Sequence, residues 1–144
     1  MTKPDNLDVL IVEDNPDDVE LTLRAFKQAR LTTAVQVVRD GVEALELLLG
    51  EEGAPPPGLP RVVLLDLKLP KVNGLETLEK IRANERTKRL PVVIVTSSRE
   101  EPDVRRAYEL GANSYIVKPV EFEKFVSDIG DVGRYWLRLN QAPS

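Results

Sequence analysis

The sequence predicts an α/β fold, namely a doubly wound, five-stranded parallel sheet in the order 2-1-3-4-5 with five helices on its faces. Three observations carry this prediction. Five short runs rich in Val, Ile and Leu recur along the chain, as is typical of strands buried on both faces. Segments with helical signals follow these runs, so strands and helices alternate. Right-handed crossovers then leave few topologies for one domain of 144 residues.

The first half of the chain contains three strands and two helices. The strands are expected at residues 8–12, 35–38 and 62–65. Asn15 is the N-cap of the first helix, which runs to about residue 29, and Pro16 suits its first position. Asp40 to Glu43 resembles a capping box and begins the second helix. Residues 50–60 form a loop, in which Pro55–Pro57 favours polyproline II structure.

The second half contains two strands and three helices. A capping-box-like start at Asn73 begins the third helix, and the strands are expected at residues 91–95 and 115–117. The fourth helix starts at Glu101 and ends at Gly111. The last helix starts near Glu121, and its predicted core-facing stripe comprises Phe122, Phe125, Ile129, Val132 and Trp136. Gly130 and Gly133 predict a kink in it.

Composition narrows the possible chemistry. The chain has no Cys and no His, which excludes disulfides, thiolate nucleophiles, zinc sites built on these residues and a phosphohistidine. Carboxylates remain, and they favour a hard cation such as Mg²⁺. The net charge of −4 argues against nucleic acid as a partner. No apolar run is long enough to span a membrane, and the N-terminus lacks a signal peptide, so we expect a cytoplasmic protein.

Polar side chains follow four of the predicted strands. They are Glu13 and Asp14, Asp66, Thr96, and Lys118. Because the carboxyl ends of parallel strands meet at one edge of a sheet, these side chains should converge on one crevice. This set suits phosphoryl transfer. The carboxylates could hold Mg²⁺, and one of them could attack phosphorus. Lys118 and Thr96 could then hold the phosphoryl oxygens. Each residue alone also has a purely structural explanation, such as charge neutralisation by Lys118. Five independent explanations of this kind, at five positions that follow strands, are not credible together.

This pattern closely resembles the receiver domain of two-component response regulators, with its flavodoxin-like fold, over nearly the whole chain. The motifs are Leu10–Asp14, Leu65–Pro70 followed by Asn73-Gly74, Val95–Ser98, and Gly111-Ala112 leading to Tyr115–Pro119. The resemblance implies that residues 1–144 are a single receiver domain without an output domain. It also implies that the protein is not an enzyme beyond catalysing its own phosphorylation and dephosphorylation.

The resemblance implies a role for each motif residue. Asp66 is the implied phosphoacceptor, and Glu13, Asp14, Asp66 and the backbone carbonyl of Lys68 are the implied Mg²⁺ ligands. Lys118 pairs with the phosphoryl group, and its bond to Pro119 would be cis. Thr96, Ser97 and Tyr115 form the phosphate-responsive switch.

A finer resemblance points to a subgroup. Asn15–Asp18, the proline-bearing insertion before Arg61 and the Tyr135–Leu137 ending are similar to the stand-alone regulators that partner bacterial phytochromes. This implies a bacteriophytochrome histidine kinase as partner and a homodimer. The expected dimer surface comprises Tyr135, Trp136, Leu137 and Leu139.

Four functions come into question for this pattern of residues. The leading one is a response regulator phosphorylated on Asp66, and the alternative left open is a degenerate receiver that acts as a phosphorylation-independent scaffold. A flavodoxin-like electron carrier is rejected because the acidic loop Glu13–Asp18 would repel a flavin phosphate. An aspartyl-phosphate hydrolase is rejected because Lys68 stands where those enzymes carry a second Asp, and no residues remain for a cap domain.

Overall fold

The computed structural model describes residues 7–50 and 58–141 of the chain. Its five strands form one parallel sheet in the order β2-β1-β3-β4-β5, which confirms the predicted topology. The strands are β1 (Val9–Val12), β2 (Val35–Val38), β3 (Val62–Leu65), β4 (Val92–Thr96) and β5 (Ser114–Val117). The helices are α1 (Pro16–Gln28), α2 (Gly41–Leu49), α3 (Gly74–Ala83), α4 (Glu101–Glu109) and α5 (Phe122–Arg134), and a π-helical turn (Tyr135–Leu139) continues α5.

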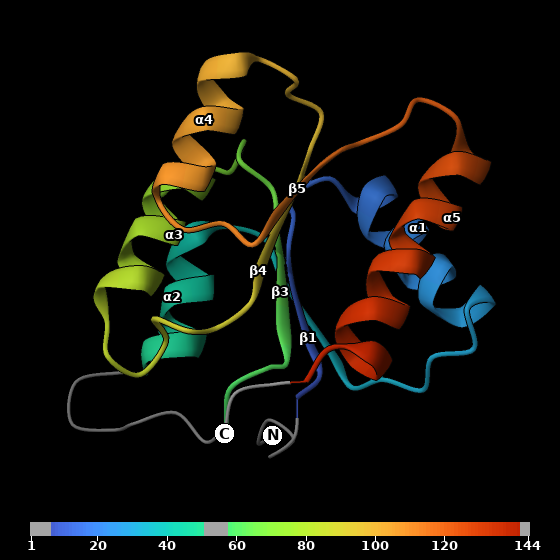
Figure 1. Cartoon of the computed structure of the whole chain (residues 1–144), viewed down its shortest axis with the longest axis horizontal. Coiled ribbons are helices and arrows are strands. Elements are labelled where there is room, and N and C mark those ends of the chain that lie inside the picture. Colours follow the sequence, from blue (N-terminus) through green and yellow to red (C-terminus); the bar gives the residue numbers. More distant parts are fainter. Residues whose placement is uncertain (1–6, 51–57, 142–144) are drawn as a thin grey trace.

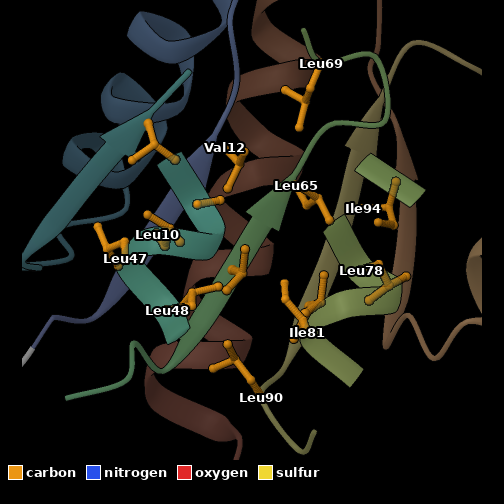
Figure 2. Packing of buried hydrophobic residues seen from close by; sticks show 14 of the residues in the cluster. Leu10, Val12, Leu47, Leu48, Leu65, Leu69, Leu78, Ile81, Leu90 and Ile94 are labelled. Atoms are coloured by element: carbon orange, nitrogen blue, oxygen red, sulfur yellow. The ribbon is translucent and has the colours of Figure 1, made fainter. Parts of the chain in front are cut away.

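The two faces of the sheet carry different helices. Helices α2, α3 and α4 cover one face, and α1 and α5 cover the other (Figure 1). Each strand contributes side chains to the hydrophobic cores on both faces of the sheet, because successive side chains point to opposite faces. In β1, Leu10 and Val12 belong to the cluster shared with α2 and α3, whereas Val9 and Ile11 belong to the cluster shared with α1 and α5. Leu10, Val12, Leu65 and Ile94 thus pack against Leu47, Leu48, Leu78 and Ile81 (Figure 2).

The predicted helix starts are confirmed by their caps. The Asn15 side chain accepts hydrogen bonds from the backbone N–H groups of Asp17 and Asp18. The Asp40 side chain accepts one from Glu43 N–H, and the Asn73 side chain accepts one from Glu76 N–H. Each cap satisfies donors that the first helical turn leaves free. These caps fix where α1, α2 and α3 leave the carboxyl edge of the sheet.

The last helix corrects one prediction and leaves another open. Phe122 is not in the buried stripe but 69% exposed, because α5 begins at this residue and its side chain lies at the helix end. The helix continues through Gly130 and Gly133 without interruption, and the predicted kink stays a prediction. Gly133 permits close packing, since a Cβ there would lie 2.6 Å from Leu31 Cδ1 and 3.0 Å from Phe26 Cε1.

The predicted dimer surface is also partly wrong. Leu137 is only 8% exposed and belongs to the core cluster of the α1/α5 face, and Trp136 is half-buried against the same cluster. Both side chains belong to the π-helical turn, in which Leu137 is the buried residue. Tyr135 and Leu139 are exposed, at 48% and 75%. The predicted polyproline segment, Pro55–Pro57, lies outside the described residues.

Among the helices that the structure describes, none combines the length and the apolar character needed to cross a bilayer.

Candidate phosphorylation and metal site

The carboxyl edge of the sheet brings the predicted acids and the lysine into direct contact. Glu13 follows β1, Asp66 follows β3 and Lys118 follows β5. Lys118 Nζ donates hydrogen bonds to Glu13 Oε1 at 2.6 Å and to Asp66 Oδ2 at 2.9 Å. It also donates one to Asp18 Oδ2 at 2.8 Å. One ammonium thus connects carboxylates that follow β1 and β3 with one from the first turn of α1.

The contacts are shielded from solvent to different degrees. Glu13 and Asp66 are buried, whereas Asp14 is exposed at the mouth of the site. Asp14 therefore faces ligands that arrive from solvent, while Glu13 and Asp66 form the floor. Buried charges of this kind need partners, because the desolvation cost is otherwise several kcal/mol.

Electrostatics at the floor are dominated by burial and by the shared lysine. Burial raises the pKa of Glu13 to about 7; the hydrogen bond from Lys118 opposes this shift and the nearby charge of Asp66 adds to it. Burial alone would lower the pKa of Lys118. Its hydrogen bonds to Asp18 and Glu13, with the charge of Asp66, outweigh that effect and raise the pKa well above its ordinary value. Lys118 is therefore a permanent cation in this site.

The donor set suits a hard divalent cation. Glu13, Asp14 and Asp66 each offer a carboxylate oxygen, and these oxygens lie within 4.8 Å of one another. Oxygen donors gathered at this spacing suit Mg²⁺ or Mn²⁺, and the chain has no Cys or His to favour a softer metal. The three side chains predicted as metal ligands are thus brought together. The role of the Lys68 carbonyl stays a prediction.

The backbone behind Asp66 is fixed by a close contact with α3. A Cβ on Gly74 would lie 2.2 Å from the Asp66 carbonyl oxygen and 2.6 Å from Leu67 Cα. Gly74 N–H also donates to the Leu67 carbonyl at 2.9 Å. The glycine therefore lets the start of α3 press against the loop that carries Asp66. The sequence places this residue at a helix start and in a family motif but does not predict its contact with the Asp66 loop.

The predicted switch residues lie on β4, its following loop and β5. Thr96 is fully buried at the end of β4, and Ser97 is exposed. Tyr115 donates its hydroxyl proton to the Ser98 carbonyl at 2.8 Å, so β5 is tied to the loop after Thr96. Ser98 Oγ in turn donates to Asp103 Oδ2 of α4 at 2.5 Å. These contacts connect the end of β4 to α4 and β5, and Ser98 was not predicted as part of them.

One predicted feature of the site is wrong. No peptide bond within residues 7–50 and 58–141 is cis, so the bond between Lys118 and Pro119 is trans. The Lys118 side chain nevertheless reaches all three carboxylates from this backbone.

Asp18 is a further residue of the site that was not predicted. Asp18 was predicted only as part of the acidic segment after the first strand, with no role in the site, yet it contacts Lys118 directly. The available signal was its place in the turn that starts directly after the acidic pair, which brings it back over the site.

Comparison with known proteins supports the same family across the chain. The family model described as response regulator receiver domain matches residues 9–130. A protein named "Probable methanogenesis regulatory protein FilR2", from Methanothrix harundinacea, is 43% identical over 94% of this chain and 86% of its own length. Response regulator Rcp1 from Synechocystis is 35% identical over 94% of this chain and 92% of its own.

Solved structures agree in fold and extent. The Mn²⁺-bound form of Rcp1 has a TM-score of 0.85 at 33% identity, covering 94% of this chain and 98% of that one. The phosphorylated cyanobacterial phytochrome response regulator RcpA has a TM-score of 0.87 at 33% identity, covering 96% and 99%. The bacteriophytochrome response regulator RtBRR is 51% identical with a TM-score of 0.71, covering 99% and 85%. With its sheet order and its cluster of acids and lysine, the chain belongs to the response regulator receiver domain family.

Proposed function

We propose that this protein accepts a phosphoryl group onto Asp66 from a phosphohistidine of a partner histidine kinase, in a Mg²⁺-dependent reaction. The observation that carries the proposal is the Asp66 carboxylate itself, which is buried beside Lys118 and within a carboxylate cluster suited to a divalent cation. The Asp66 oxygen would form the new bond to phosphorus while the bond from phosphorus to the histidine nitrogen breaks. The freed imidazole stays with the partner, and the chain has no His of its own.

Each neighbour of Asp66 has a definite task in this proposal. Glu13 and Asp14 would hold Mg²⁺ together with Asp66, and the bound cation would offset the charge of the incoming phosphoryl oxygens. Lys118 would pair with one of those oxygens. Thr96, Ser97 and Tyr115 would pass the change to α4 and β5, because Tyr115 and Ser98 already connect these elements. Phosphorylation would then shift the population of an interaction surface.

For the partner, we propose a bacteriophytochrome kinase. The support is the 51% identity to the bacteriophytochrome response regulator RtBRR and the similarity to Rcp1 and RcpA. FilR2, at 43% identity, has a name that refers to methanogenesis, so the partner needs a direct test. Two labelled donors test this, a bacteriophytochrome kinase and an unrelated histidine kinase, each autophosphorylated beforehand. We expect faster transfer of label from the phytochrome to the chain, none to Asp66→Asn, and normal transfer to the surface variant Asp128→Asn.

The outcomes separate the parts of this proposal. Equal rates from both donors would contradict the phytochrome partnership alone. Label on Asp66→Asn would contradict the acceptor assignment. Absence of transfer from either donor would favour the alternative, a receiver that acts as a binding scaffold without phosphorylation.

Metal affinity should depend on pH through Glu13. Because the pKa of Glu13 is raised to about 7 in the metal-free site, the carboxyl group must lose a proton before it binds a cation. Affinity for Mg²⁺ should therefore rise by up to about tenfold per pH unit between about pH 5 and 7, and level off above 7. Calorimetric titration at several pH values measures this. The dependence should flatten in Glu13→Gln, and an unchanged slope in that variant would contradict the assignment to Glu13.

We also propose that the protein forms a homodimer through the exposed apolar side chains of the C-terminal turn. Tyr135 and Leu139 are the predicted dimer residues that remain exposed. Leu139→Glu should lower the mass measured by light scattering from that of a dimer toward that of a monomer. Glu109→Lys, on α4, serves as a charge-changing control at a distance from this turn. A monomer in the unaltered protein, with and without beryllofluoride, would contradict the dimer.

A further inference from the structure

Asp18 takes part in the site although none of the predicted site residues includes it. Its Oδ2 atom accepts a hydrogen bond from Lys118 Nζ at 2.8 Å, and its side chain is 23% exposed. We propose that Asp18 is a positioning residue of the phosphorylation site, which holds the Lys118 ammonium in place beside Asp66. The inference rests on the proposed function and adds a residue to it.

The hydrogen-bond count at Lys118 singles out Asp18. An ammonium has three N–H donors. In this site they are directed to Glu13, Asp18 and Asp66, at 2.6, 2.8 and 2.9 Å. In the proposed reaction Glu13 serves the metal and Asp66 serves phosphorus, whereas Asp18 lies outside the metal-binding group of carboxylates. Asp18 is therefore the acceptor that can stay on Lys118 throughout the reaction.

The backbone of α1 holds Asp18 firmly enough for this task. Its N–H donates to the Asn15 side chain at 3.3 Å, and its carbonyl accepts from Thr22 Oγ1 at 2.9 Å. Thr22 is itself buried. Because its N–H and carbonyl groups are both hydrogen-bonded, the backbone of Asp18 has a fixed position in the first turn of α1. The Asp18 carboxylate can therefore hold the Lys118 ammonium in place.

Asp17 provides a matched comparison within the same turn. Its N–H is also capped by Asn15, at 2.9 Å, but its side chain is exposed and makes no ion pair with any residue of the described chain. Asp17→Asn and Asp18→Asn remove the same charge from neighbouring positions of one helix start. A difference between them therefore reports the contact with Lys118 rather than net charge or capping.

The sign of the effect distinguishes positioning from simple charge. If Asp18 acted only through its negative charge, removing it would weaken the repulsion of an incoming phosphoryl group and speed the reaction. If it positions Lys118, its loss leaves one N–H donor without an acceptor and the ammonium less well placed. Phosphoryl transfer depends largely on positioning and electrostatic stabilisation, so the reaction would then slow down.

The first test is the rate of phosphorylation by acetyl phosphate at saturating Mg²⁺, followed by intact-protein mass. We expect Asp18→Asn and Asp18→Ala to react at least about fivefold more slowly than the unaltered chain, and Asp17→Asn to stay within about twofold. Thermal unfolding of all variants should agree within a few degrees, which shows that folding is intact. A rate for Asp18→Asn equal to or above that of Asp17→Asn would overturn the proposal.

A second readout needs no phosphorylation. The ¹H–¹⁵N resonance of the Lys118 ammonium, assigned by its loss in Lys118→Arg, should be sharp in the unaltered chain and in Asp17→Asn. It should broaden through faster proton exchange in Asp18→Ala. If no form of the chain is phosphorylated but this contrast is seen, the proposed function fails while Asp18 still holds Lys118. If the resonance is the same in all three proteins, the positioning role itself is overturned.

Discussion

Replacement of Lys118 by methionine should destabilise the metal-free protein by about 3 kcal/mol at pH 8 and make its stability depend more strongly on Mg²⁺ than that of the unaltered chain. Lys118 is the shared partner of Glu13, Asp18 and Asp66, and the side chains of Glu13 and Asp66 are each only 8% exposed. Methionine fills similar space but leaves these carboxylates without a cation. Mg²⁺ would supply the missing positive charge and restore much of the loss.

Urea unfolding of the variant, in chelator and in excess Mg²⁺, measures both parts of this prediction. Lys124→Met is the matched control, because Lys124 pairs with Asp128 on the surface with 64% of its side chain exposed. Exposed pairs of this type contribute up to about 1 kcal/mol. Equal losses in the two variants, or a loss at Lys118 that Mg²⁺ leaves unchanged, would contradict the role of Lys118 as the cation of the site.

Gly74→Ala should cost about 3 kcal/mol in unfolding free energy and sharply reduce phosphorylation of Asp66. The added Cβ would meet the Asp66 carbonyl oxygen at 2.2 Å and Leu67 Cα at 2.6 Å. Both are backbone atoms, so no side-chain rotation relieves the clash. Either α3 moves away or the loop that carries the acceptor moves, and the second change alters the geometry on which phosphoryl transfer depends.

Gly130→Ala is the control for this substitution. The nearest atom to its Cβ would be Ala29 Cβ at 3.6 Å, an ordinary contact, and the residue lies within α5. Alanine there should stabilise the protein by up to about 1 kcal/mol. Denaturant unfolding and phosphorylation rates of both variants give the comparison. If Gly74→Ala retains the stability and rate of the unaltered chain, the close contact does not hold the acceptor in place.

The fold could be predicted because its local signals agree with one another. Buried strands of apolar residues, caps at Asn15, Asp40 and Asn73, and right-handed crossovers all point to one topology, and the sheet has that topology. The convergence of Glu13, Asp66 and Lys118 followed from it, because parallel strands end at one edge. These residues lie directly after strands, so their positions depend little on how the helices pack.

The remaining features depend on contacts that spacing does not encode. Asp18 joins the site through the direction of one side chain in the first turn of α1. Gly133 allows α5 to approach Phe26 and Leu31 closely, whereas in the sequence a glycine at this position indicates a kink. Leu137 is buried in the π-helical turn that follows α5, and an apolar residue on a terminal helix is equally compatible with a core or a surface position.

The central claim is that Asp66 accepts a phosphoryl group in a Mg²⁺-dependent reaction, and the mass of the intact protein after incubation with acetyl phosphate tests it most directly. The claim predicts a gain of one phosphoryl group that requires Mg²⁺, is absent in Asp66→Asn and is removed by hydroxylamine. A gain that persists in Asp66→Asn would contradict the acceptor. No gain in the unaltered chain, together with no response of its spectra to beryllofluoride and Mg²⁺, would contradict phosphorylation altogether and leave the scaffold.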